Sequence, residues 1–208
     1  MKFVARLILA LLVAVNFAFA RAQEMAPDAL VKKTTDEIVA QIKKDKSLVS
    51  NSKKLLDLVD RLVLPHFNFS RMTMLAVGRP WRDATPVQRE QLERQFRMLL
   101  VRTYSTALEQ YSDQAIEVKP VSLKAGDSET IVRTQISQPG GQPIPLDYRM
   151  EKTPNGWKVY DVTVEGVSIV TTYRSTFNAE VTKGGINGLI KTMTDQNAKL
   201  EARAAEKT

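Results

Sequence analysis

The sequence predicts an α+β fold in which a four-stranded antiparallel sheet is packed with helices. Three observations predict it. Between residues 27 and 111, apolar residues recur at the three- and four-residue spacing of helices. Between residues 115 and 165, apolar and polar residues alternate in short runs separated by turn sequences, as in antiparallel strands. After Gly166 the helical spacing returns.

Residues 1–22 have the organisation of a cleavable export signal. Lys2 and Arg6 precede an apolar run, residues 7–20, which is shorter than the ~20 residues that span a bilayer. The run ends in two overlapping Ala-x-Ala sites, and we expect cleavage after Ala22 rather than Ala20. An uncleaved anchor is the alternative, and the short run disfavours it. The chain has no cysteine, which excludes a lipoprotein tethered by an acylated cysteine.

Composition narrows the classes of function. Without cysteine there are no disulfides, so stability must come from burial. Cleavage would remove Lys2, Arg6 and Arg21, leaving 27 basic and 23 acidic residues and a net charge of +4. Nucleic-acid-binding domains show a stronger basic excess with interleaved aromatic residues. The balance therefore argues against a nucleic-acid-binding protein.

The segment 23–84 is predicted to form a helical subdomain. Its first helix starts at Pro27 and ends near Lys46, and a second helix runs from Leu55 to Pro65. A short helix follows, with Ser70 as its expected N-cap and Gly78 just after its end.

A long helix is expected next, from residue 86 to about residue 111. Thr85 and Gln88 have the spacing of a capping box around Pro86. Leu92, Phe96 and Leu99 begin an apolar face that continues toward Tyr111.

Strands are predicted over residues 115–123, 130–137, 146–151 and 157–165, and Gly166 is expected to end the sheet. Alternation assigns Tyr160, Val162 and Val164 to the inner face of the last strand. A helix from Ile169 is then broken at Gly184-Gly185, and a further helix, within 186–208, is expected to join the helical subdomain. Residues 85–185 would form the α+β domain.

Residues typical of catalytic and metal sites are scarce. His66 is the single histidine, and a structural role at a helix end is the favoured interpretation. The glycine-rich run 184–188 could bind a phosphate at a helix start, but a corner between helices is favoured. Tyr160 and Asp161 could serve an isomerase only if both lined one cavity, and alternation sends them to opposite faces. We therefore predict no enzyme, no metal and no cofactor.

Several segments, taken in order, resemble the MlaC family of periplasmic phospholipid-binding proteins, also called toluene-tolerance or ABC-transporter auxiliary proteins. They are Leu64-Pro65-His66-Phe67-Asn68-Phe69, Ala84-Thr85-Pro86-Val87-Gln88-Arg89, Trp157-Lys158-Val159-Tyr160-Asp161-Val162, Glu165-Gly166-Val167-Ser168-Ile169-Val170, Tyr173-Arg174 and Gly185-Ile186-Asn187-Gly188-Leu189-Ile190. The family often has Asp where Asn68 stands here.

The resemblance implies an NTF2-like domain, a helical subdomain, and an apolar pocket between sheet and helices. It also implies a monomeric periplasmic carrier whose cargo is a phospholipid. Such a carrier would move lipid between an outer-membrane lipoprotein–porin complex and an inner-membrane ABC transporter with an MCE-domain protein, maintaining outer-membrane lipid asymmetry. A periplasmic chaperone or lipoprotein carrier, and an NTF2-like small-molecule isomerase, remain the alternatives.

The residues expected to contact the lipid are selected only by the face of the strand or helix on which they lie, and plain core packing is the alternative for each of them. The sheet side would comprise Val132, Ile136, Leu146, Tyr148, Met150, Tyr160 and Val162. The helix side would comprise Phe96, Leu99, Leu100, Tyr104, Leu108, Ile169, Tyr173 and Phe177. Five arginines around the start of the long helix are candidates for docking partners or headgroups, although a solvated helix face with i,i+4 ion pairs is the favoured alternative: Arg79, Arg82, Arg89, Arg94 and Arg97.

Overall fold

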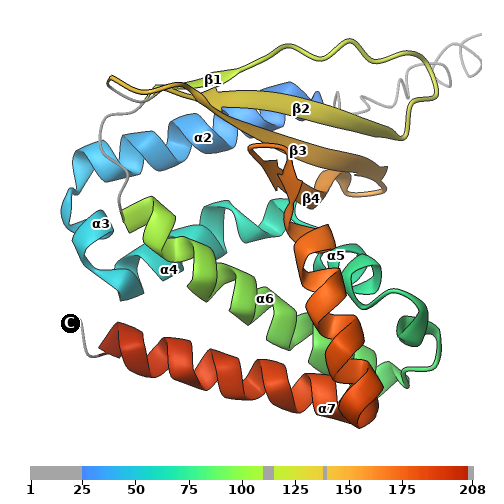
Figure 1. Ribbon diagram of the computed structural model, residues 1–208. Coiled ribbons are helices and arrows are strands. Elements are labelled where there is room, and N and C mark those ends of the chain that lie inside the picture. The colour runs from blue at the N-terminus through green and yellow to red at the C-terminus, as the bar shows by residue number, and fades with distance from the viewer. Residues whose placement is uncertain (1–24, 110–114, 138–139, 206–208) are drawn as a thin grey trace, which may run out of the picture.

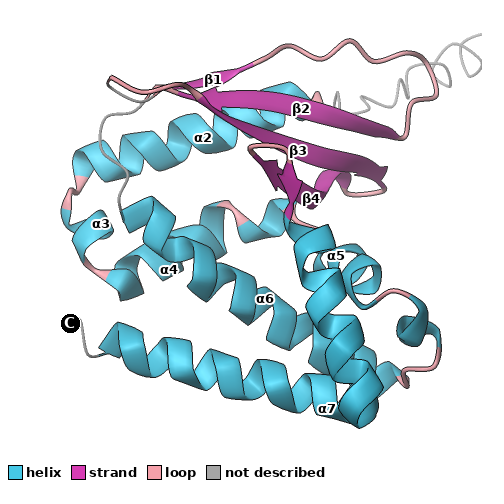
Figure 2. Ribbon diagram, viewed as in Figure 1, coloured by secondary structure: helices cyan, strands magenta, loops and turns pink. Residues whose placement is uncertain are grey.

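A computed structural model describes residues 25–109, 115–137 and 140–205, with only the backbone for residues 105–109. The predicted export signal lies outside this part of the chain. The described chain is α+β, with one sheet and a layer of helices beside it (Figures 1 and 2). This confirms the predicted fold class.

The sheet is an antiparallel meander in the order β1-β2-β3-β4-β5. Its strands are β1 (Ile116–Val118), β2 (Glu129–Ile136), β3 (Ile144–Thr153), β4 (Gly156–Val164) and β5 (Val167–Ser168). The first four correspond to the predicted strands. The prediction that Gly166 ends the sheet was wrong, because Glu165 and Gly166 both adopt positive φ and turn the chain into the two-residue β5.

The first helices are α2 (Pro27–Lys44), α3 (Ser47–Ser50), α4 (Ser52–Leu62), η1 (Leu64–His66) and α5 (Phe69–Val77). The N-cap of α5 is Asn68, whose side-chain oxygen accepts a hydrogen bond from the Arg71 amide at 3.0 Å. The prediction of Ser70 in this role was wrong, because the helix begins one residue before it.

The longer helices follow: η2 (Arg79–Arg82), α6 (Pro86–Glu109) and α7 (Ile169–Ala205). The capping box is confirmed, with the Thr85 amide donating to Gln88 at 2.9 Å and the Gln88 amide donating to Thr85 at 3.2 Å. α7 folds back on itself at Gly185, where φ is 64° and ψ is −166°, a conformation open essentially to glycine. The glycine-rich run is thus a corner between two helical arms.

Two apolar cores divide the molecule. The helical core joins α4, α5, α6 and both arms of α7, which together we call the helical layer. The sheet-side core lies between the sheet and α2, which crosses one face of the sheet (Figure 1). We call that face the inner face. Phe67 and Ile169 pack against both cores and so mark the seam between them. None of the described helices is long and apolar enough to cross a membrane.

Candidate functional site

The inner face of the sheet carries a continuous apolar row. Val132, Tyr148 and Val162 are register partners across β2, β3 and β4, so their side chains lie beside one another. Leu146 and Met150 flank Tyr148 on the same face. The structure therefore brings together five of the seven residues predicted for the sheet side. Ile136 is half-buried and belongs to neither core.

Tyr148 indicates that this face is incompletely filled. Burial alone raises the pKa of its hydroxyl to about 12, so the group lies deep within the protein. Yet the side chain keeps accessible surface, and no described residue hydrogen-bonds the hydroxyl. A buried tyrosine hydroxyl ordinarily has a partner. Among the described residues, this hydroxyl lacks the partner that a buried tyrosine ordinarily has.

The prediction that Tyr160 lines the inner face was wrong. A register shift between Arg149 and Met150 makes a β-bulge opposite Tyr160 in β4. The extra residue breaks the alternation, so Val159 and Val162 both face the sheet-side core while Tyr160 joins the helical core. The alternation of apolar and polar residues cannot reveal such a bulge, because it assumes that successive residues of a strand always point to opposite faces of the sheet.

Tyr160 instead belongs to a polar cluster that we call the clamp: Asn68, Arg71, Glu129, Glu151 and Tyr160. The Arg71 guanidinium donates to Glu151 and, at 2.5 Å, to Glu129, and it lies 3.8 Å from the centroid of the Tyr160 ring. Asn68 donates to Glu151 at 2.7 Å, and the Tyr160 hydroxyl donates to Glu129 at 3.1 Å. The clamp thus ties α5 to β2, β3 and β4.

The charges of the clamp stabilise one another. Burial by itself would lower the pKa of Arg71, but its hydrogen bonds to Glu129 and Glu151 outweigh burial and raise that pKa. The hydrogen bond from Arg71 is the main cause of the lowered pKa of Glu129. Burial, followed by the bond to Glu129, raises the pKa of Tyr160. These shifts favour Arg71 as a cation, Glu129 as an anion and Tyr160 as a neutral phenol.

The helix-side residues gather in the helical core. Phe96, Leu99, Leu100 and Phe177 are buried there, and Tyr173 and Ile169 lie at its border. The rings of Tyr173 and Phe177 each stand edge-on to Phe96 at 5.1 Å between centroids. Tyr104 is 39% exposed, although burial raises the pKa of its hydroxyl. The Leu108 side chain lies outside the described residues.

A recess of about 380 Å³ opens between α6 and the two arms of α7. Leu99, Tyr173 and Phe177, which were predicted to contact lipid, line this recess. Leu189, Met193 and Leu200 line it as well, although the sequence did not lead us to predict them. Their helical spacing was visible, but only the fold-back at Gly185 places the second arm of α7 opposite the first. The two predicted sides of the pocket lie in different cores and meet at the seam, where Ile169 contacts both.

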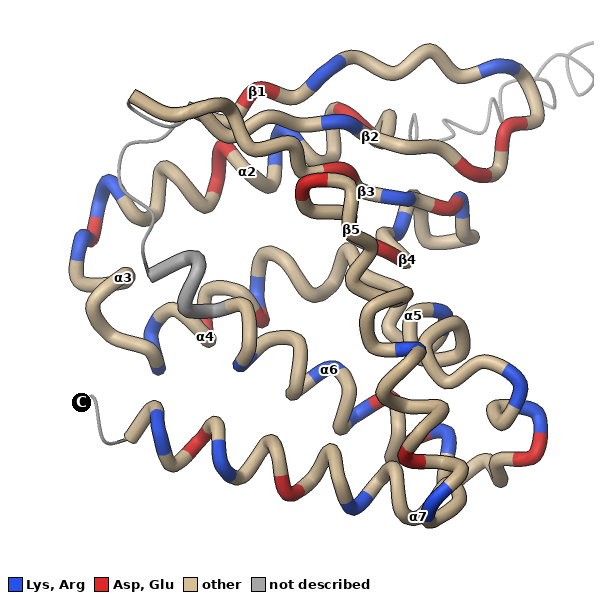
Figure 3. Tube along the Cα trace, in the orientation of Figure 1, with Lys and Arg blue, Asp and Glu red and all other residues tan. Residues whose placement is uncertain are grey.

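The five predicted docking arginines divide into two groups. Arg89 donates to the backbone oxygens of Trp81 and Arg82, and Arg97 pairs with Asp60 at 2.9 Å. The side chains of Arg79, Arg82 and Arg94 are exposed and pair with no described residue. Figure 3 shows basic residues around the connection between α5 and α6.

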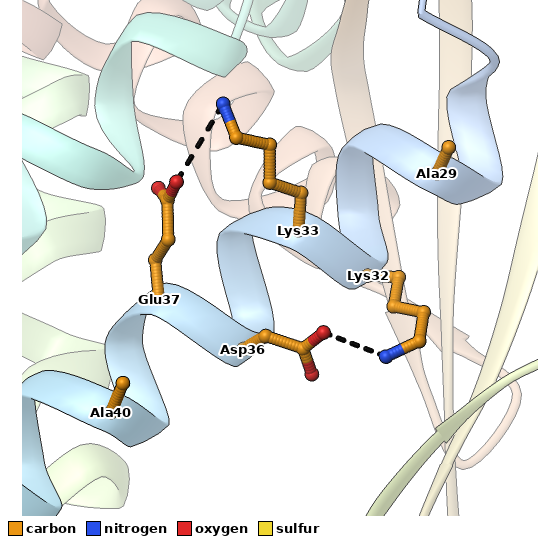
Figure 4. Close-up of a pocket in the computed structure, with 6 residues that line it drawn as sticks. All are labelled: Ala29, Lys32, Lys33, Asp36, Glu37 and Ala40. Carbon is orange, nitrogen blue, oxygen red and sulfur yellow. Dashed lines mark hydrogen bonds and ion pairs between the residues drawn. The ribbon is translucent and has the colours of Figure 1, made fainter.

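A larger hollow, of about 420 Å³, lies along α2 alone (Figure 4). Ala29 and Ala40 lie at its ends, and two ion pairs edge it, Lys32–Asp36 at 2.6 Å and Lys33–Glu37 at 3.6 Å. These exposed charges already have partners, and a single helix cannot enclose a ligand. This hollow is therefore a solvated helix face.

The residues considered for catalysis have structural roles. Asp161 accepts hydrogen bonds from the Ser168 hydroxyl at 2.7 Å and from the Val170 amide at 3.2 Å. Its carboxylate therefore caps the start of α7. The Tyr160 hydroxyl faces Glu129, on the far side of the sheet from Tyr148. Within the described chain, no group of His, Cys, Asp and Glu has the geometry to hold a metal ion.

Comparison with known proteins gives one consistent result. The family model for the MlaC protein matches residues 32–195. The toluene tolerance protein ttg2D of Pseudomonas putida is 28% identical over 169 residues, covering 80% of this chain and 78% of its own. The MlaC binding protein of the intermembrane phospholipid transport system of Haemophilus influenzae is 28% identical over 175 residues, covering 82% and 81%.

Among solved structures, the phospholipid-binding protein from Ralstonia solanacearum, in complex with a phospholipid, has a TM-score of 0.77 and 40% sequence identity. The match covers 84% of this chain and 98% of that one. The family match spans both cores, the bulged strand β4 and the corner at Gly185. The chain belongs to the MlaC family.

Proposed function

We propose that this protein is a periplasmic carrier that binds one phospholipid at a time by its acyl chains and shuttles it between membrane complexes. The observation that carries the proposal is Tyr148 itself, which keeps accessible surface and has no hydrogen-bond partner among the described residues, on an otherwise apolar sheet face. The lipid-bound relative from Ralstonia solanacearum supports it.

Free-energy arithmetic explains the need for such a carrier. A diacyl phospholipid carries about 30 methylene groups, and each costs about 0.8 kcal/mol to expose to water. Moving the free lipid through water would therefore cost roughly 20 kcal/mol. A carrier must cover the acyl chains, and it can leave the hydrated headgroup in solvent.

The inner face suits a cargo that must also be released. Its partly accessible side chains are those of Leu146, Tyr148 and Val164, whose apolar surfaces contact hydrocarbon without directional bonds. We propose that the acyl chains lie against Val132, Leu146, Tyr148, Met150 and Val162, and that they continue past Ile169 toward Tyr104 and the helical recess. No cofactor enters this function, and catalysis has no part in it.

The proposed acyl-chain site is tested by substituting bulky side chains that occupy it. Tyr148→Trp and Val162→Trp, made separately and together, should reduce the phospholipid that co-purifies with the protein several-fold. Ile131→Trp is the matched control, because Ile131 neighbours Val132 in β2 but is exposed on the opposite face. Native mass spectrometry gives the lipid per protein, and circular dichroism checks the fold.

Equal lipid content in the inner-face variants and in Ile131→Trp would overturn this site. A protein that carries no phospholipid from cells, and takes up none from vesicles, would overturn the proposed function itself. Turnover of a small ketone by a lipid-free protein would favour the isomerase instead. Co-purified lipoprotein or unfolded polypeptide would favour a lipoprotein carrier or chaperone.

Docking to acidic surfaces of the membrane complexes is the second part of the proposal. The expected partners are the MCE-domain protein of an inner-membrane ABC transporter and an outer-membrane lipoprotein–porin complex. Arg79, Arg82 and Arg94 are the best candidates, since their charges are unpaired among the described residues, whereas Arg89 and Arg97 also hold the fold together.

Charge reversal separates docking from folding. Arg79→Glu with Arg82→Glu should weaken binding to the purified MCE domain at least several-fold and make the remaining binding less sensitive to salt. Lys124→Glu, in the exposed turn before β2, is the matched control. Binding that is equal in both variants would remove these arginines from the docking surface.

A further inference from the structure

The recess between α6 and the two arms of α7 combines an apolar floor with a basic end. Leu189 and Met193 line it and are fully buried. Lys199 and Arg203, farther along the second arm of α7, line the same recess and are exposed to solvent. They are four residues apart, so they lie on one face of the helix, about one turn from each other. Such a hollow suits a ligand that has both a hydrocarbon part and an anionic group.

The two cations have no hydrogen-bond or ion-pair partner among the described residues. Acidic and basic residues alternate along this arm of α7 (Figure 3), but the acidic ones are already paired. Asp195, one turn before Lys199, pairs with Lys191 at 2.6 Å. Glu201 pairs with Arg102 of α6 at 3.0 Å. Uncompensated positive charge therefore remains at this end of the recess.

The helical turn that carries the cations is fixed against α6. The buried Asn197 side chain donates to the backbone oxygen of Gln95 at 2.9 Å and to its side-chain oxygen at 2.8 Å. Arg102 donates to the Asn197 carbonyl at 2.7 Å. Lys199 thus extends from a backbone that is already in place, which reduces the entropy lost when a ligand binds.

The acidic residue that lines the recess lies toward its other end. Glu180 accepts a hydrogen bond from the Thr192 hydroxyl at 2.9 Å and pairs with Lys183 at 3.1 Å. Thr192 precedes Lys199 and Arg203 by roughly 10 and 16 Å along a helix that rises 1.5 Å per residue. Both separations exceed the Debye length of about 8 Å at physiological salt. Glu180 therefore does not neutralise the two cations.

We propose that Lys199 and Arg203 bind the phosphate group of the phospholipid cargo, at the end of the acyl chains that reaches the helical recess. The inference rests on the proposed function, in which the acyl chains run from the inner face past Ile169 toward this recess. The phosphodiester of a phospholipid carries one negative charge on two free oxygens, so each cation can pair with one of them. Because both cations are exposed, the rest of the headgroup stays in solvent and is not selected.

Competition between two lipids in one vesicle tests this phosphate site. The vesicles contain phosphatidylglycerol and diacylglycerol with the same acyl chains, so the two lipids differ only in the phosphoglycerol group. Lipid-free protein is incubated with them, and native mass spectrometry gives the ratio of the two lipids that it takes up. Both lipids leave the same membrane surface, so any effect of charge on the encounter with the vesicle cancels in the ratio.

Lys199→Gln with Arg203→Gln should lower the ratio of phosphatidylglycerol to diacylglycerol by about four- to twentyfold, since each exposed ion pair changes an affinity by roughly two- to fivefold. High salt should reduce this difference. Lys43→Gln with Lys191→Gln is the matched control, because it removes the same charge at exposed positions outside the recess. Lys199→Arg with Arg203→Lys keeps both charges and should keep the ratio.

A ratio that is unchanged in Lys199→Gln with Arg203→Gln would overturn the phosphate site but not the carrier, because both lipids would still be taken up. An equal fall in the uptake of both lipids would assign the cations to the encounter with the vesicle, and it would also overturn the site. If the unchanged protein took up neither lipid, the proposed function would fall, and the phosphate site with it.

The reactivity of a single amine gives an independent measurement. A lysine beside a phosphate is held in its charged form, and only the neutral amine reacts with acetic anhydride. Acetylation of Lys199 should therefore slow by about two- to fivefold in protein loaded with phosphatidylglycerol, but not in protein loaded with diacylglycerol. Lys43, exposed on α2, is the internal reference. Equal rates at Lys199 in the two samples, measured by peptide mass spectrometry, would remove it from the phosphate site.

Discussion

Residues at the centre of the helical core and residues along the inner face of the sheet are covered to different extents. Leu92 and Phe96 have no exposed surface, and aromatic rings pack edge-on against Phe96. Leu146, Tyr148 and Val164 keep part of their surface accessible. The comparison separates residues that close packing fixes in place from residues beside which a ligand finds space.

The largest test of this difference uses one substitution in both cores. Leu92→Ala would leave a cavity in a closely packed region and should lower the free energy of unfolding by about 2–5 kcal/mol. Leu146→Ala should cost less, below about 2 kcal/mol, because its surroundings are already open. Urea denaturation of lipid-free protein measures both values. If Leu146→Ala cost as much as Leu92→Ala, the surroundings of Leu146 would be as tightly packed as those of Leu92.

A smaller effect separates the two faces of the sheet. Tyr160→Phe removes the hydroxyl that donates to Glu129 and should cost about 1 kcal/mol of unfolding free energy. Tyr148→Phe removes a hydroxyl without a partner among the described residues, so it should leave stability unchanged or raise it. The two variants serve as controls for each other. A loss in Tyr148→Phe equal to that in Tyr160→Phe would show that the Tyr148 hydroxyl is bonded after all.

The smallest expected effect is the pH dependence of the clamp. The hydrogen bond from Arg71 lowers the pKa of Glu129 in the folded state. A carboxyl group with a lowered folded pKa adds stability above its unfolded pKa of about 4.3, and this stability is lost as pH falls through the folded value. Glu129→Gln should therefore flatten the fall in melting temperature below about pH 4.3.

The control for this prediction is Glu90→Gln, on the exposed face of α6. It should keep the acid profile of the unchanged protein. If Glu129→Gln had the same melting-temperature profile at acid pH as the unchanged protein, the Glu129 carboxylate would contribute nothing to the pH dependence of stability. Because Glu129 is half exposed, high salt should also reduce the effect.

Particular residues show how far sequence reasoning reached. Alternation placed Val132, Tyr148 and Val162 on one face, and the capping box located the start of α6 to the residue. The same alternation failed at Tyr160, because the bulge adds one residue to β4, so Val159 rather than Tyr160 shares the inner face with Val162. Leu189 and Met193 were recognised as helical but not as partners of Phe177, because sequence spacing does not specify how sharply a chain turns at a glycine.

The sequence by itself determined the order of helices and strands, the capping box, the break at Gly185 and the family. These depend on local spacing and on backbone preferences that each residue carries with it. Only the tertiary structure decided that the lining residues divide between two cores and that Tyr160 leaves the inner face for the clamp. The physical reason is that packing and ion pairing join residues distant in the chain. Arg71 meets Glu129 and Glu151 only once the sheet and α5 are in place.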